Sequence, residues 1–116
     1  MQTGFRLTRS EDFKRVRQSG KSYAHPLMVL IVQANDEVKL RVGVTAGRGV
    51  GTAVKRNQAK RLMREAMRPL PPSIVPGWDL VLIARPLISS ATLSDTRQAL
   101  LTLLQRAGLF SLNDAV

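Results

Sequence analysis

The sequence predicts a single α+β domain in the order α-β-β-β-α-β-α, with a mostly antiparallel central sheet packed by helices. First, the chain has 116 residues and 44% hydrophobic residues, which suits one core and not two. Second, strand-like apolar patterns occupy 27–32, 38–46 and 78–84. Third, helical spacing occupies 10–18, 53–68 and 94–107.

The first helix is expected over 10–18, after a loose arm. Ser10 is a suitable N-cap, Glu11 and Asp12 place acid in the first turn, and Gly20 stands where a helix often stops.

The strands before the central helix are expected to form an antiparallel hairpin. Residues 27–32 are continuously apolar, which is typical of a strand covered on both faces. After the turn signal Asn35-Asp36, apolar residues alternate from Val38 to Ala46, so one face belongs to the core and the other is polar and basic. A short extra strand is possible at 22–25.

The last part of the chain is predicted to be a proline-rich connector, a buried strand and a helix. The helix is capped by Ser94 and ends at Gly108, and its leucines indicate that it serves the core. The whole chain 1–116 is treated as one domain, and 1–5 and 109–116 are expected to fray.

Four single residues leave alternatives open. Phe13 is either a core anchor or a stacking platform for an unpaired base, the second only if its helix borders an open groove. Trp78 is expected to pack where its strand begins. Arg85 is either solvated or part of a basic surface. His25, the only histidine, is given no ligand role.

The stretch 43–68 carries the main functional signal. It begins with four glycines in nine residues, turns into a helix at Thr52 or Ala53, and stops at Pro69. With residues about 100° apart around the helix axis, one sector is a cationic strip made of Arg56, Asn57, Lys60, Arg61, Arg64 and Arg68. The opposite sector is apolar and consists of Ala59, Leu62, Met63 and Ala66. Such a helix can pack on a sheet and still present charge.

The cationic strip differs from an ordinary solvated face, on which both signs of charge alternate. Glu65 is the only acid from Arg41 to Arg68, against eight lysines or arginines. These like charges repel one another in the free protein, so a polyanion is the natural partner. Asn57 is either an ordinary surface residue or a source of directional hydrogen bonds to phosphate, sugar or base.

Composition narrows the class of partner. A net charge of +10 favours nucleic acid over an anionic membrane, because a membrane helix needs bulky apolar residues opposite its charges. The start of the chain lacks the apolar core of a signal peptide, and no apolar run approaches the roughly 20 residues of a spanning helix. With no cysteine either, we expect a soluble cytoplasmic protein without disulfides.

The sequence offers no catalytic constellation. Its eight carboxylates are single or in adjacent pairs, and there is one histidine, so no triad or acidic metal cage can be assembled. The loop 47–51 lacks the Lys-Ser or Lys-Thr ending of a nucleotide-binding P-loop. We interpret it as a tight turn into a helix whose N-terminus can hold a phosphate. The protein alone is expected to bind without cleaving.

The order GVGTAVKRNQAKRLMRE resembles the signature of the protein subunit of bacterial ribonuclease P. That signature is roughly a basic residue followed by Val-Gly-x-Ala-Val-x-Arg-Asn-x-x-Lys-Arg-x-x-Arg. The matching positions are Val50, Gly51, Ala53, Val54, Arg56, Asn57, Lys60, Arg61 and Arg64. The resemblance extends over nearly the whole chain, including Arg6-Leu7, Glu11 to Phe13 and Ala84-Arg85.

The resemblance implies a function and a topology. In that family, an RNA subunit holding magnesium ions removes the 5′ leader of precursor tRNA by endonucleolytic cleavage, and the small basic protein assists. It implies that this chain binds the RNA subunit and the leader, as a monomeric protein within a ribonucleoprotein. No cofactor is expected on the protein alone, and magnesium enters through the RNA. The family also implies a left-handed β-α-β crossover, against the general right-handed rule.

The resemblance carries site residues over by position. The residues that the resemblance places against the catalytic RNA are Arg48, Arg56, Asn57, Lys60, Arg61, Arg64 and Arg68. It places the leader in a cleft between the first helix and the sheet, for which we expect Phe13, Arg17, Arg41 and Arg85. Phe13 matches an aromatic of that cleft.

Four departures from the family pattern affect these expectations. Gln58 replaces a basic residue, although it is turned away from the strip, and Gly49 replaces a second basic residue beside Arg48. Arg17 and Ile31 stand where the leader cleft has aromatics, so leader binding is expected to depend more on charge than on stacking.

Other functions remain open at this point. The alternative is a ribosomal-protein-like or general RNA chaperone module with no substrate role, which would not distinguish tRNA carrying a leader from mature tRNA. A nuclease in its own right is disfavoured by the scattered carboxylates. A DNA regulator is disfavoured because no second helix is placed to make a helix-turn-helix.

Overall fold

The structure, a computed structural model, describes residues 6–110. Its helices and strands follow the predicted order: α1 (Ser10–Ser19), β1 (Lys21–Ala24), β2 (Met28–Ala34), β3 (Arg41–Ala46), α2 (Ala53–Met67), β4 (Trp78–Ala84) and α3 (Leu93–Arg106). Three short 3-10 helices, η2 (Arg48–Val50), η3 (Pro71–Ser73) and η4 (Pro86–Ser90), lie in the connections. The possible short strand before Pro26 is present as β1.

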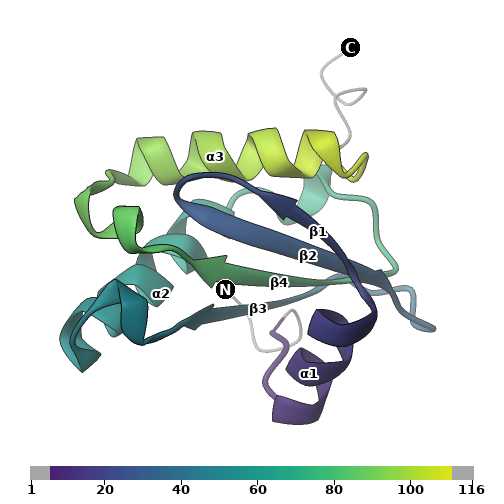
Figure 1. Ribbon diagram of the computed structural model, residues 1–116. Coiled ribbons are helices and arrows are strands. Elements are labelled where there is room, and N and C mark those ends of the chain that lie inside the picture. Colours follow the sequence, from purple (N-terminus) through teal and green to yellow (C-terminus); the bar gives the residue numbers. More distant parts are fainter. Residues whose placement is uncertain (1–5, 111–116) are drawn as a thin grey trace.

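The four strands form one mixed sheet in the order β1-β2-β4-β3 (Figure 1). The pairs β1–β2 and β2–β4 are antiparallel, and β3–β4 is parallel. The predicted hairpin of β2 and β3 is therefore wrong, because β4 lies between these two strands. Apart from Asp79, strand β4 is apolar on both faces, which suits an interior position covered by helices.

Helices cover both faces of the sheet. On one face, α2 and α3 pack with Met28, Leu30, Leu80 and Leu82 into the main core. On the other face, Val16 of α1 packs with Ile31, Val81 and Leu7 into a smaller cluster. Figure 1 shows α1 and α3 on opposite sides of the sheet. The β3–α2–β4 unit is the expected crossover, and its left-handed sense stays a prediction from the resemblance.

Two predicted helix caps are wrong by one or two residues. Arg9, without a side-chain cap, precedes α1, and Ser10 is already helical. In α3 the cap is Thr92 and not Ser94, because Thr92 and Asp95 satisfy each other's backbone N–H groups in a capping box. Gly108 ends α3 with φ +73°, as the glycine stop predicts.

Gly20 ends α1 for a different reason from the one predicted. Its φ is −81°, so no left-handed conformation is needed. A Cβ at Gly20 would lie 2.5 Å from the carbonyl oxygen of Val16 in α1, and on the β2 side 2.7 Å from Ile31 Cγ2 and 2.8 Å from the carbonyl oxygen of Val32. The glycine is therefore needed for the close approach of the chain to β2.

Two apolar residues are placed differently from the prediction. Val38, expected in the core face of β3, is 87% exposed in the turn before that strand. Leu109, expected to fray with the tail, is buried, and its carbonyl accepts from the N–H of Val75 at 2.9 Å. Phe110 forms a bridge with Ile74. The expected fraying of 1–5 and of 111–116 lies outside the described residues.

Candidate nucleic-acid interface

Helix α2 has the two faces that its sequence predicts. Thr52 caps it, accepting from the N–H of Lys55 at 3.3 Å. Its buried residues are Ala59, Met63, Ala66 and Met67. Leu62 is half-buried against the same core. On the cationic strip, Asn57, Arg61 and Arg68 are exposed, while Arg56, Lys60 and Arg64 are half-buried.

Helix α3 holds the end of α2 in place. The guanidinium of Arg97 donates to the backbone carbonyls of Glu65 and Ala66 at 3.1 and 3.3 Å. Carbonyls in the last turn of a helix have few partners within the helix; Arg97 donates to that of Ala66 and adds a second donor to that of Glu65, which also accepts from the N–H of Arg68. The cationic strip is thus presented on a helix that is fixed at both ends.

Most of the strip keeps its charge available. Within residues 6–110, Arg68 pairs with Glu65 at 2.8 Å, and none of Arg48, Arg56, Lys60, Arg61 and Arg64 lies within salt-bridge distance of a carboxylate. The Arg68 pair is largely exposed, so it contributes little stability. A polyanion that meets this strip has few internal pairs to displace.

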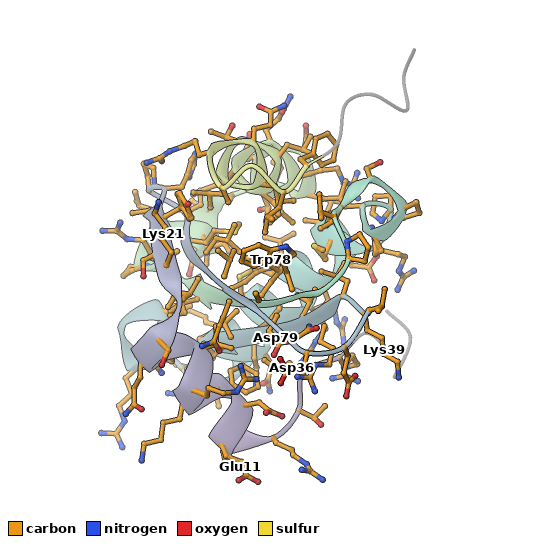
Figure 2. The ribbon with its side chains drawn as sticks, turned by 90° about the vertical axis from the view of Figure 1, so that its right-hand side faces the viewer. Glu11, Lys21, Asp36, Lys39, Trp78 and Asp79 are labelled. Carbon is orange, nitrogen blue, oxygen red and sulfur yellow. The ribbon has the colours of Figure 1, made fainter. Side chains whose placement is uncertain are left out.

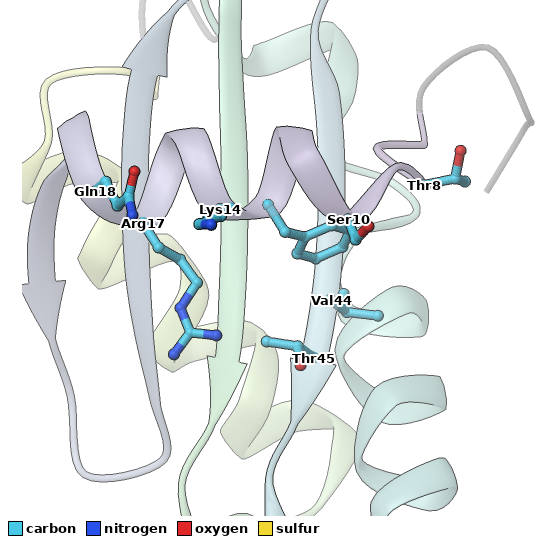
Figure 3. A pocket seen from close by; sticks show the side chains of 8 residues that line it. Thr8, Ser10, Lys14, Arg17, Gln18, Val44 and Thr45 are labelled. Atoms are coloured by element: carbon cyan, nitrogen blue, oxygen red, sulfur yellow. The ribbon is translucent and has the colours of Figure 1, made fainter.

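A hollow of about 560 Å³ lies between α1 and the sheet. Its lining consists of Thr8, Ser10, Phe13, Lys14, Arg17, Gln18, Val44 and Thr45. Figure 3 shows Arg17 and Thr45 projecting into it from α1 and from β3. Two of the four residues predicted for the leader cleft, Phe13 and Arg17, therefore line one hollow at the predicted place.

Phe13 packs in the core and also lines the hollow, while its stacking role stays a prediction. Its half-buried ring packs with the small cluster beneath α1, and it also lines the hollow. The ring lies directly on the backbone of β3, because a Cβ at Gly43 would stand 2.4 Å from the ring carbon Cζ. The same side chain is a core anchor and a wall of an open groove.

Arg41 is not part of this hollow. Its Nε and Nη2 donate to the two carboxylate oxygens of Asp79, each at 2.8 Å, and Arg15 of α1 donates to the same carboxylate at 2.6 Å. Asn35 donates to it at 2.9 Å. In the β3–β4 register Arg41 pairs with Asp79, whereas Thr45 pairs with Ile83 at the other end of the strands. A role for Arg41 in the leader cleft stays a prediction, and the structure shows it in an ion pair.

The Asp79 carboxylate is fully buried and ionised. Figure 2 shows it on the side of the sheet that faces α1, whereas its neighbour Trp78 points toward α3. Burial alone would raise the pKa of Asp79, but hydrogen bonds from Arg41, Arg15 and Asn35 outweigh burial and hold that pKa below its usual value. The same hydrogen bonds raise the pKa of both arginines.

The remaining predicted positions lie apart from the hollow. Arg85 is exposed after β4 and donates to the carbonyl of His25 at 3.4 Å. Ile31, at a position where the family has a leader aromatic, is 5% exposed beneath α1. Trp78 packs against the main core as predicted. Gln58 is exposed on α2, and Gly49 lies near Pro86 of η4.

Sequence reasoning missed Lys14 in the hollow and the pair formed by Arg15 and Asp79. A signal for the pair was present: Asp79 is the one acid in the apolar run 78–84, and a buried carboxylate requires a charged or hydrogen-bonding partner. Which of the many arginines supplies it depends on the packing of α1, which no local pattern encodes.

The described residues show neither a candidate metal site nor a candidate membrane-spanning helix. Residues 6–110 contain no group of three or more His, Cys, Asp or Glu side chains that could hold a metal ion. In the same range, none of the helices has the length and apolarity to cross a membrane.

Known proteins are similar to this chain in sequence and in fold. The sequence model of the family described as Ribonuclease P matches residues 1–108. The chain belongs to the ribonuclease P protein family. A ribonuclease P protein component from Herpetosiphon aurantiacus is 41% identical over 110 residues, covering 95% of this chain and 89% of that protein.

Solved structures of ribonuclease P proteins agree with this assignment. The Staphylococcus aureus protein superposes with a TM-score of 0.82 at 28% identity, covering 92% of this chain and 98% of that one. The Thermotoga maritima protein superposes with a TM-score of 0.78 at 32% identity, covering 87% and 96%. The family is the protein subunit of ribonuclease P, so the partnership with the RNA of that ribonucleoprotein and a part in tRNA processing follow from membership.

Proposed function

We propose that this chain binds the RNA subunit of ribonuclease P through the cationic strip of α2 and holds the 5′ leader of precursor tRNA in the hollow beneath α1. One observation carries the proposal: the strip and the hollow adjoin. Arg64 of the strip lines a second, smaller hollow that shares Phe13, Thr8 and Val44 with the first. A single RNA-facing surface thus runs from α2 to α1.

The chemistry of the larger hollow suits an unpaired strand. Single-stranded RNA is held by aromatic rings that stack on bases and by cations that follow the backbone. Phe13 offers the ring, and Lys14 and Arg17, both exposed on α1, offer the charge. Because Arg17 and Ile31 replace two aromatics of the family pattern, we expect charge to contribute more than stacking in this protein.

We assign cleavage to the RNA subunit and its magnesium ions. Among residues 6–110, there is no group of three or more His, Cys, Asp or Glu side chains that could hold a metal ion. The chain supplies positive charge, which displaces counterions from two polyanions held close together, the RNA subunit and the precursor tRNA. We expect one protein copy to act in each complex, and a cytoplasmic location remains a prediction from composition.

The test is cleavage of a precursor tRNA by a bacterial ribonuclease P RNA at low magnesium concentration, with and without this protein. A protein-only reaction is the control. The proposal predicts stimulation by the protein, no cleavage by the protein alone, and tighter binding of precursor tRNA than of mature tRNA to the assembled enzyme. RNA binding without stimulation and without that preference would instead support the chaperone alternative.

A further inference from the structure

A second hollow, of about 170 Å³, opens where the arm before α1 meets α2. The backbone of β3 at Gly43 and the Phe13 side chain contribute to its lining. Two arginines from distant parts of the chain also line it: Arg6 in the arm and Arg64 on α2. Arg6 is absent from the sites expected from the resemblance.

The backbone fixes the place of Arg6. It forms a parallel bridge with Val42, and the N–H of the next residue, Leu7, donates to the carbonyl of Val42 at 2.8 Å. Leu7 is 4% exposed in the cluster beneath α1, which anchors the arm. Arg6 therefore lies along the edge of the sheet that β3 forms, the strand directly before α2 in the chain.

The two guanidinium groups have no anionic partner in the described structure. Across residues 6–110, neither Arg6 nor Arg64 lies within salt-bridge distance of a carboxylate. Burial, and then the positive charge of Arg6, lower the pKa of Arg64, so its charged form is stabilised less in the free protein than in water. An anion placed between the two arginines would relieve that repulsion.

We propose that Arg6 and Arg64 together form a binding site for one phosphodiester group of an RNA backbone. Guanidinium groups present paired donors that match phosphate oxygens. The apolar Phe13 and Leu7 beside them suit the sugar that adjoins the phosphate. Because Phe13 also lines the larger hollow, a strand held there can pass directly to this phosphate site and on toward α2. The proposal rests on the proposed function only in taking RNA as the partner.

The phosphodiester can come from the leader or from the RNA subunit, and two binding measurements distinguish these sources. The first is the affinity of the protein for ribonuclease P RNA without substrate. The second, at saturating protein, is the affinity of the assembled enzyme for precursor tRNA with a long leader and with a leader of a single nucleotide. A third measurement, binding of a single-stranded oligoribonucleotide to the protein alone, does not depend on ribonuclease P function.

The variants are Arg6→Gln, Arg64→Gln and the double substitution. Arg9→Gln is the matched control, because Arg9 is an exposed arginine of the same arm that does not line the hollow. Each single substitution should weaken binding of the oligoribonucleotide by about tenfold. It should also weaken, by about the same factor, either the binding of ribonuclease P RNA or the binding of precursor tRNA to the assembled enzyme. The log-log salt slope should fall by roughly 0.7. Since both arginines bind one phosphate, the double variant should lose less than the product of the two single losses.

The outcomes separate the phosphate site from the proposed function. Losses equal to that of Arg9→Gln, or losses that multiply independently, would overturn the shared site. A lower melting temperature for Arg6→Gln would also overturn it, because removing a repulsion should leave the fold as stable or more stable. If the wild-type protein failed to stimulate cleavage while oligoribonucleotide binding still depended on both arginines, the phosphate site would stand and the proposed function would fall.

Discussion

The Phe13 ring lies so close to Gly43 that a Cβ at that glycine would come within 2.4 Å of Cζ and 2.7 Å of Cε1. Strand β3 can therefore hold the aromatic wall of both hollows only because position 43 has no side chain. The contact places the ring by packing and not by a hydrogen bond. It joins the small cluster beneath α1 to the proposed RNA surface.

Gly43→Ala should displace the Phe13 ring and cost about 1–3 kcal/mol of unfolding free energy, because an added methyl group has no room. The affinity of the assembled enzyme for leader-bearing tRNA should fall with it. Gly47→Ala is the control, since a Cβ there meets nothing within 4 Å, and its unfolding free energy should stay within about 0.5 kcal/mol of the wild type. Urea unfolding of both variants checks the difference. Equal stabilities would show that the ring is not held by this contact.

Asp79→Asn should destabilise the fold by about 3 kcal/mol or more, because it leaves Arg41 and Arg15 without their shared carboxylate at a fully buried position. Asp36→Asn removes an exposed carboxylate from the turn between β2 and β3 and should change stability little. Urea midpoints at neutral pH compare the two variants. Similar midpoints would contradict a structural role for this network.

The same carboxylate should make stability fall in acid. Although burial opposes ionisation, the hydrogen bonds of Asp79 lower its pKa from the ordinary 3.8, so its contribution is complete above that value and is lost as the pH falls through the lower, folded-state pKa. The stability difference between the wild type and Asp79→Asn should therefore stay constant from neutral pH to about pH 5 and shrink below about pH 4. Urea titrations at a series of pH values measure it. If the stability difference shrank between pH 7 and pH 5, the pH dependence would belong to groups other than Asp79.

The sequence predicted elements better than contacts. The helical spacing of α2 and its two faces are local properties, and the structure confirms both. Strand pairing is not local: β2 and β3 are neighbours in the chain with a turn signal between them, yet β4 separates them in the sheet. The apolar run of β4 indicated burial on both faces, but alternation patterns do not say which neighbours a buried strand takes.

The residues of the candidate site also divide into those that local patterns predict and those that depend on contacts between distant segments. Phe13 and Arg17 share one side of α1 through helical spacing, so their common hollow could be anticipated. Arg41 was predicted for the same cleft, but its pairing with Asp79 depends on the register between β3 and β4, which no local pattern encodes. Arg6 matches the family pattern but was not predicted as a site residue, because its place depends on a bridge to Val42, a contact between segments far apart in the sequence.

Two arginines of α2 should differ in their contribution to RNA binding. Arg61 is exposed and unpaired among the described residues, whereas Arg68 already contacts Glu65 at 2.8 Å. Arg61→Gln should lower the log-log salt slope of binding to ribonuclease P RNA by roughly 0.7 to 0.9, and Arg68→Gln should lower it less. Filter binding at several salt concentrations measures both slopes. An unchanged slope and affinity for Arg61→Gln would show that this face of α2 does not meet the RNA.

Arg17 and Arg41 were predicted for one cleft, but substitution of Arg17 should affect RNA binding and substitution of Arg41 should affect the stability of the fold. Arg17 is exposed and lines the larger hollow, so Arg17→Gln should leave urea unfolding unchanged. It should weaken binding of leader-bearing tRNA to the assembled enzyme about three- to tenfold, without changing the affinity for mature tRNA. Arg41→Gln should destabilise the fold, because the buried Asp79 loses two of its hydrogen bonds. If Arg17→Gln weakened precursor and mature tRNA equally, the hollow would bind another part of the RNA, and the leader would have to lie elsewhere on the protein.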